Sequence, residues 1–231
     1  MGDAPAAIAR WTSCGDPMEL DRLYSLLDQN MDVEDWWPSD GPFEVMVGAL
    51  LTQQTTWEKV VPVLDALEEK GLMTPLPLSL CPLDELQAVI QPTGFYRQKA
   101  RRLIRISQHI VNRHEGKPGK LLLGDLTDRR QELLSLPGVG PETADSMLLF
   151  GGARPKFVAA SYVLRVFHRT GVLPDGDYRS AQALVETRYP DDAHRYRQLY
   201  AMLVQLAKQY CRSRPRCNRC PLGQDCSFTH Q

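Results

Sequence analysis

The apolar residues of this chain recur with the spacing of an α-helix almost everywhere, and that periodicity most narrows the folds open to it. The segment MELDRLYSLLDQ has leucines at 20, 23, 26 and 27, and YRQKARRLIRISQHIVNRH places Leu103, Ile106 and Ile110 on one face. No alternating strand pattern of any length occurs, so the sequence predicts an all-α protein. Further helices are expected in PFEVMVGALLTQQT, WEKVVPVLDALEEKG, PLDELQAVI, TDRRQELLSL, PETADSMLLFGG, SYVLRVFHRTG, YRSAQALVETRYP and AHRYRQLYAMLVQLAKQYC.

The composition is that of an ordinary soluble globular protein. The 231 residues are 43% hydrophobic and 24% charged with a net charge of −1, so the whole molecule is not an obvious polyanion binder. No apolar run is long enough to cross a bilayer, and the sequence does not begin like a signal peptide. We therefore expect a cytoplasmic protein with reduced thiols and no membrane partner. Basic residues cluster over 97–105 and 208–219, which fits either solvated helix faces or contacts with phosphates.

The stretch LLSLPGVGPETADSML joins two short predicted helices through a tight turn at residues 136–140. Gly138 and Gly140 allow backbone geometry that side chains would forbid, and backbone N–H groups there can point at an outside anion. Pro141 suits the first turn of the following helix, whose N-terminus also favours an anion. The stretch looks like a helix-hairpin-helix, a motif that grips a DNA phosphate without reading sequence. A plain connection between two helices is the alternative.

Four of the six cysteines lie close together near the end of the sequence. They have the spacing C-x5-C-x2-C-x5-C and are Cys211, Cys217, Cys220 and Cys226. Without a recognisable secretory signal disulfides are not expected, and zinc sites usually pair two knuckles across a longer gap. One compact run of thiols around a central Cys-x2-Cys favours a [4Fe–4S] cluster over zinc. The loop between Cys211 and Cys217 carries Arg212, Arg214 and Arg216. The cluster is therefore interpreted as a structural element that fixes a phosphate-binding loop rather than as a redox centre.

These motifs together resemble the endonuclease III superfamily of DNA glycosylases. The stretches GALLTQQTTW, TGFYRQKA, LPGVGPETAD and FVAASYVLRV follow the family's order and spacing, and the resemblance covers residues 20–226. It implies two helical domains with a DNA-binding cleft between them. A six-helix barrel with the hairpin would cover 31–150, and residues 1–30 would join 151–231 around the cluster. The first cysteine gap is five residues here against the family's usual six, which leaves the loop geometry open.

The resemblance also implies a partner and an activity. The partner is double-stranded DNA with a damaged base, which such enzymes flip out of the duplex and remove by hydrolysis of its glycosidic bond. Gln54, with Gln53 beside it, matches the residue that fills the gap left in the base stack. The candidate DNA contacts of the hairpin are Leu136, Gly138, Val139, Gly140 and Thr143. We expect a monomer, located in the cytoplasm at the nucleoid if the protein is bacterial.

Two positions select the branch of the superfamily. Glu142 stands where members that also cleave the strand carry a lysine, and a carboxylate cannot form their Schiff base, so we expect no lyase activity by this route. The segment DWWPSDGPFE and the aromatic residue after LTQQTT resemble the 3-methyladenine (alkylpurine) branch. An alkylated purine carries a positive charge that is attracted to aromatic faces, and its glycosidic bond is already weakened. Trp36, Trp37 and Trp57 are interpreted as walls of a pocket that selects the base by stacking, with a core role as the alternative.

The helix that follows FVAA lacks the residue expected at its start. In the family an Asp caps this helix and faces the sugar of the flipped nucleotide, and the matching residue here is Ala160. The chain is either an engineered inactive variant or a natural member that has lost or relocated its carboxylate. Asp145, three residues after Glu142, is the best substitute, although a structural role suits it better.

We thus expect a monofunctional alkylpurine glycosylase that is inactive or impaired. The alternatives are a non-catalytic protein that binds damaged DNA and a glycosylase directed at pyrimidines.

Overall fold

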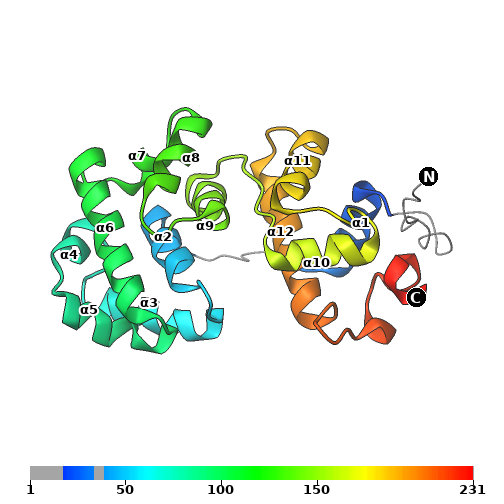
Figure 1. Ribbon diagram of the computed structural model, residues 1–231, viewed down its shortest axis with the longest axis horizontal. Helices are drawn as coiled ribbons and strands as arrows, with labels where there is room; N and C mark the ends of the chain where they lie inside the picture. Colours follow the sequence, from blue (N-terminus) through cyan, green and yellow to red (C-terminus); the bar gives the residue numbers. More distant parts are fainter. Residues whose placement is uncertain (1–17, 34–38, 231) are drawn as a thin grey trace, which may run out of the picture. The chain divides into compact units, whose positions relative to one another are not determined.

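The computed structural model describes residues 18–33 and 39–230, and every regular element within these ranges is a helix (Figure 1). Twelve α-helices run from α1 (Leu20–Asn30) to α12 (Ala193–Gln209) among the described residues. The prediction of an all-α fold is confirmed. No helix in these ranges is both long and apolar enough to span a bilayer.

The chain divides into two compact units. Among the described residues, the hairpin unit comprises 39–158 and Glu186–Gln198, and the cysteine unit comprises 18–33, Ala159–Val185 and 199–230. Residues 151–158 and Glu186–Gln198 group with the hairpin unit, whereas the division expected from the sequence assigned them to the part that carries the cysteines.

The hairpin unit is built around the long helix α6 (Tyr96–His114). Its inward residues Leu103, Ile106 and Ile110 are at most 2% exposed, as their helical spacing predicts. α4 (Pro75–Leu80) and α5 (Leu83–Ile90) pack against α6 (Figure 1). α2 (Pro42–Leu51) and α3 (Trp57–Glu69) contribute to the same core. Nearly all of α2 is buried, which explains why its sequence is apolar on every side.

The sequence does not predict two short helices of this unit. α4 and α7 (Pro118–Leu122) each begin with a proline, which suits the first helical position because the N–H that proline lacks would have no helical partner there. The segments PLPLSL and PGKLL are too short to show a helical period, and proline and glycine make them read as loops.

The hairpin consists of α8 (Leu126–Ser135) and α9 (Pro141–Ser146). The side chain of Asp125 caps α8 by accepting a hydrogen bond of 3.0 Å from the N–H of Asp128. After α9 the predicted helix changes into a π-helical turn over Met147–Gly151. A Cβ atom on Gly151 would lie 3.2 Å from Leu122, so the absence of a side chain lets this turn pack closely on α7.

In the cysteine unit, α1 and α10 (Ser161–Thr170) each bury one face. Leu23 and Leu27 of α1 are fully buried, and so are Val163 and Val166 of α10. The chain beyond α12 forms three short 3-10 turns, η3 (Cys217–Arg219), η4 (Gly223–Asp225) and η5 (Ser227–His230). An ion pair of 2.9 Å between Arg22 of α1 and Asp225 of η4 connects the two ends of the described chain.

Candidate DNA-binding and catalytic site

Two buried side chains hold the loop of the hairpin. Leu136 is 8% exposed and Val139 is 6% exposed, and both belong to the core of the hairpin unit. Gly138 and Gly140 are exposed, and the N–H of Val139 donates to the carbonyl of Leu136 at 3.1 Å. Leu136 and Val139 were predicted as DNA contacts. Because their side chains anchor the loop, they can meet DNA only through their backbone.

The two glycines of the loop differ in what they require. Gly138 has a φ of +80°, and a Cβ atom there would lie 2.1 Å from Nε of Arg102. A side chain at 138 would therefore strain the backbone and displace Arg102. Gly140 has a φ of −94° and a ψ of 179°, which any residue adopts, and no atom lies within 4 Å of its Cβ position. Packing within the described residues does not require glycine at 140, so this space is available to a ligand.

Gln53 takes part in a hydrogen-bond network with the hairpin. Its Nε2 donates to the carbonyl of Gly138 at 2.9 Å and to Oγ1 of Thr143 at 3.0 Å. Its Oε1 accepts a hydrogen bond of 2.7 Å from Nη1 of Arg102. Since both ends of the amide are engaged, Gln53 links the loop after α2 to the hairpin.

Gln54 is exposed and has a left-handed backbone, with a φ of 55°. Phe95 has the same combination, with a φ of 49° and 59% exposure. Positive φ is uncommon for residues other than glycine, asparagine and aspartate, and it is an outlier for a bulky side chain. An exposed aromatic residue held in this conformation is therefore a candidate functional residue. Phe95 is not among the site residues predicted from the sequence, because nothing in TGFYRQKA distinguishes an exposed aromatic residue from a buried one.

Lys99 connects the two loops that carry Gln54 and Phe95. The lysine is 1% exposed, and its Nζ donates to the carbonyls of Leu51 and Thr93 at 2.8 Å each. Burial lowers the pKa of Lys99 to about 8. The lysine thus fixes the C-terminal end of α2 beside the turn that precedes α6, which keeps the two left-handed residues in neighbouring loops.

Trp57 is partly buried and packs against the core of the hairpin unit. This contact agrees with the core role that was the alternative to a pocket wall. Trp36 and Trp37, the other two predicted pocket residues, lie outside the described residues.

The two carboxylates of α9 have different surroundings. Asp145 is fully buried, and its Oδ1 and Oδ2 accept hydrogen bonds of 2.6 and 3.1 Å from Nε and Nη2 of Arg130. Such a bidentate pair joins α9 to α8, which agrees with the structural role of Asp145 rather than with catalysis. Glu142 is exposed in the first turn of α9, yet the protein atoms around its carboxyl desolvate it and raise its pKa.

The N-terminus of α10 has no side-chain cap. Ala160 occupies the N-cap position, and it is 2% exposed. Ala159 before it is fully buried, and Ser161 is the first helical residue. A capping side chain would accept a bond from the second or third N–H of the helix. Ala160 therefore provides no acceptor for these groups and no carboxylate for catalysis.

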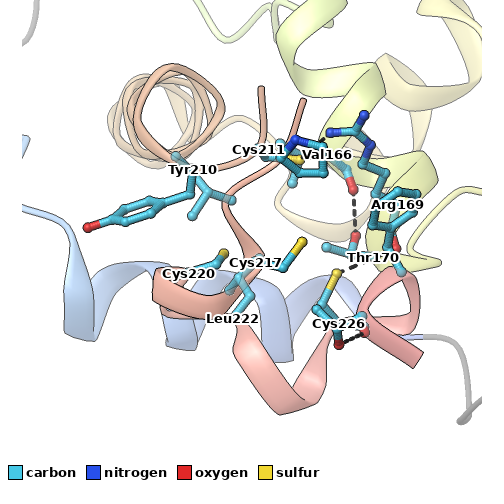
Figure 2. Close-up of a pocket in the computed structure, with 13 residues that line it drawn as sticks. Val166, Arg169, Thr170, Tyr210, Cys211, Cys217, Cys220, Leu222 and Cys226 are labelled. Atoms are coloured by element: carbon cyan, nitrogen blue, oxygen red, sulfur yellow. Dashed lines mark hydrogen bonds between the residues drawn. The ribbon is translucent and has the colours of Figure 1, made fainter. Parts of the chain in front are cut away.

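Figure 2 shows four cysteines around one pocket of the cysteine unit, namely Cys211, Cys217, Cys220 and Cys226. Val166, Arg169 and Thr170 of α10, Leu206 of α12 and residues of the segment after α12 line the rest of this pocket. Burial raises the pKa of the Cys220 and Cys226 thiols, and the neighbouring cysteines add to this effect. The four residues predicted as cluster ligands thus line the same pocket. Because burial disfavours their charged form, the thiolates need a positive charge nearby.

Two arginines of α10, which the sequence analysis did not single out, hold the first cysteine loop. Nε of Arg165 donates to the carbonyl of Cys211 at 2.7 Å. Nη1 of Arg169 donates to the carbonyl of Arg212 at 2.6 Å and to Sγ of Cys211 at 3.4 Å. α10 therefore has the Ala160 position at its start and contacts the cysteine loop at its other end.

The arginines of this loop remain open to solvent. Arg212, Arg214 and Arg216 are exposed. The N–H of Arg216 donates to the carbonyl of Tyr210 at 2.9 Å, which closes the loop. Their positive charges lie on a loop with fixed ends, as a phosphate-binding role requires.

Comparison with known proteins agrees with this arrangement. Residues 47–190 match the HhH-GPD superfamily of base excision DNA repair proteins. A protein of Methanocaldococcus jannaschii assigned as a DNA repair glycosylase is 34% identical over 208 residues, which are 89% of this chain and 94% of that protein. A thymine-DNA glycosylase of Aeropyrum pernix is 29% identical over 202 residues, which are 84% of this chain and 85% of that protein. The structure of a non-covalent endonuclease III–DNA complex matches with a TM-score of 0.75 at 25% identity, over 91% of this chain and 96% of that chain.

The hairpin, the helical fold and these relatives lead to one conclusion. The chain belongs to the HhH-GPD superfamily of base excision DNA repair proteins.

Proposed function

We propose that the chain is a monofunctional DNA glycosylase with impaired catalysis, which binds damaged duplex DNA and removes bases whose glycosidic bond is already weak. The observation that carries this proposal is the start of α10, where Ala160 supplies neither a cap nor a carboxylate. A carboxylate at this position would activate water or stabilise the oxocarbenium ion. Glu142 cannot form a Schiff base, so the proposal includes no lyase activity.

Alkylated purines are the substrate class that such a site suits best. Their positive charge weakens the bond to the sugar, so the base can leave with less help from a protein carboxylate. The same charge favours stacking on aromatic faces, and Trp57 is a partly buried aromatic residue. Pyrimidine-directed excision is the second candidate, favoured by the 29% identity with a thymine-DNA glycosylase.

The proposed DNA contacts follow from exposure and backbone geometry. The hairpin would grip a phosphate through backbone N–H groups at the N-terminus of α9. Gln54 is the better candidate for filling the gap in the base stack, because the Gln53 amide is engaged with the hairpin. Phe95 would stack on an unpaired base, a contact worth about 1–3 kcal/mol. The arginines of the cysteine loop would bind further phosphates.

The cysteine pocket fits a [4Fe–4S] cluster better than a single zinc ion. The four cysteines line one pocket and come from one compact run of the sequence around a central Cys-x2-Cys. Structural zinc sites usually pair two knuckles across a longer gap. A compact run of four thiolates is typical of the ligands of an iron–sulfur cluster. When bound, the cluster would stabilise the four thiolates and hold the arginine loop in place.

The test compares base release by the wild type, Ala160→Asp and Ala160→Asn from duplexes that contain methylated purines, uracil or mismatched thymine. Ala160→Asp should release methylated purines about 10²–10⁴-fold faster than the wild type, the usual contribution of such a group. Ala160→Asn provides the cap without the charge and should release bases at the wild-type rate. Neither variant should cleave the DNA strand.

Each other result has a separate meaning. Equal rates for the wild type and Ala160→Asp would refute the proposal that Ala160 impairs catalysis. Faster release of thymine or uracil than of methylated purines would favour the second substrate class. Tight binding of damaged duplexes with no release by any of the three proteins would favour a DNA-damage-binding protein without catalysis.

A further inference from the structure

We propose that His109, His114 and Glu132 form a binding site for a divalent transition-metal ion such as zinc, in the hairpin unit and separate from the cysteines. One ligand atom from each of these residues lies within 4.8 Å of the other two. Two imidazoles and one carboxylate are the protein ligands of open zinc sites, in which water takes the fourth position. This site does not depend on the proposed glycosylase activity.

The ligand atoms already face one another. Nε2 of His109 and Nε2 of His114 each lie 2.7 Å from Oε1 of Glu132, and the ring centroids of the two histidines are 5.5 Å apart. An ion placed among these three atoms would replace the two hydrogen bonds by coordinate bonds. Each neutral imidazole then carries its remaining proton on Nδ1, and a ring that was protonated releases one proton to solvent.

The surroundings orient the ligands and leave them accessible. Nη1 of Arg129 donates to Oε2 of Glu132 at 2.5 Å, which turns Oε1 toward the histidines as outer-shell partners do in metal sites. The His109 and Glu132 side chains are each 21% exposed, and that of His114 is 10% exposed. An ion can therefore enter from solvent without unfolding of the unit.

Metal at this position would join α6 to α8. α6 carries Lys99 and Arg102, which hold the loop of Gln53 and Gln54. α8 leads directly into the hairpin loop, and its Arg130 binds the carboxylate of α9. A bond between these helices therefore stabilises the parts of the hairpin unit that carry the proposed DNA contacts. Since the three ligands come together only in the folded chain, the metal should also raise the midpoint of thermal unfolding.

The test uses the protein purified with iron in its cysteine site, to which zinc is added before unbound metal is removed. We expect about one zinc ion per chain, with only nitrogen and oxygen neighbours at about 2.0–2.2 Å in zinc K-edge X-ray absorption. Zinc should also raise the thermal midpoint. His109→Gln and Glu132→Gln each remove a proposed zinc ligand. Loss of an outer-shell partner alone costs about 10- to 100-fold in metal affinity, so each variant should bind zinc at least about tenfold more weakly. Glu115→Gln is the matched control, because this exposed carboxylate bonds Lys120 and should not alter zinc binding.

Three results would overturn the proposal. Sulfur neighbours at about 2.3 Å would assign the zinc to cysteines. Failure of the wild type to retain zinc, or an unchanged zinc affinity in Glu132→Gln, would show that the cluster is only a hydrogen-bonded link between helices. Glu132→Gln keeps an oxygen that can accept from both imidazoles, and circular dichroism without zinc verifies that it folds. His109→Gln gives an independent measurement if Glu132→Gln does not fold.

Discussion

Replacing Gly140 by alanine should weaken DNA binding while leaving the free energy of unfolding nearly unchanged. The new Cβ finds an ordinary extended backbone and no protein atom within 4 Å. Alanine restricts the unfolded chain more than glycine does, which favours folding by about 0.4–1 kcal/mol. Gly140 is the N-cap of α9, where alanine is less favourable than glycine by a similar amount, so the two effects nearly cancel. A phosphate gripped by the loop backbone would instead meet the new methyl group. Loss of one hydrogen bond to a charged group costs about 1.5–3 kcal/mol, so DNA affinity should fall about 10- to 150-fold.

Gly138→Ala is the matched comparison, because its main effect should be on folding. A φ of +80° costs alanine about 1–2 kcal/mol. The new Cβ would lie 2.1 Å from Nε of Arg102, so that side chain must move and lose its hydrogen bond to Gln53. Together these effects should lower the free energy of unfolding by about 2.5–5 kcal/mol.

Urea denaturation measures both stabilities, and fluorescence anisotropy of a labelled duplex at several salt concentrations measures affinity. Loss of one phosphate contact should reduce the slope of log affinity against log salt by about 1. If Gly140→Ala binds DNA with wild-type affinity and slope, the hairpin backbone is not the phosphate grip. If the free energy of unfolding of Gly140→Ala is as low as that of Gly138→Ala, the conclusion that a Cβ atom at position 140 meets no protein atom is wrong.

Three further predictions follow from buried charges and from the cysteine loop. Folding lowers the pKa of Lys99 to about 8, so the unfolded chain binds more protons than the folded chain between about pH 8 and 10.4. The free energy of unfolding of the wild type should therefore increase relative to that of Lys99→Met as the pH rises through this range, and urea denaturation measures this difference. Arg169→Lys removes the guanidinium group that binds the cysteine loop. During exposure to a chelator this variant should lose iron and visible absorbance faster than the control variant Arg219→Lys, in which an exposed arginine is changed. Arg130→Met leaves the buried Asp145 carboxylate without its arginine, and thermal or urea unfolding should show a loss of about 3–5 kcal/mol. A change below about 1 kcal/mol would mean that this pair does not hold the hairpin helices together.

The sequence predicted the long helices well because each of them buries one face, which leaves a period of three to four residues in its own amino acids. α6 is the clearest example, with Leu103, Ile106 and Ile110 all buried. The short helices α4 and α7 leave too few residues for such a period. The contact between Arg169 and Cys211 joins residues 42 positions apart, and the bond from Lys99 to Leu51 spans 48. No local pattern records contacts of that kind.

By itself the sequence determined the helical class, the hairpin turn, the set of four cysteines and the alanine at position 160, where the family resemblance implies a carboxylate. Each of these depends on residue types at fixed separations along the chain. Only the tertiary structure decided that Gln53 is bound to the hairpin while Gln54 is exposed, and that Asp145 is buried against Arg130. Neighbouring residues of the same chemistry separate in this way because burial and hydrogen bonding depend on segments that are distant in sequence and meet only when the chain folds.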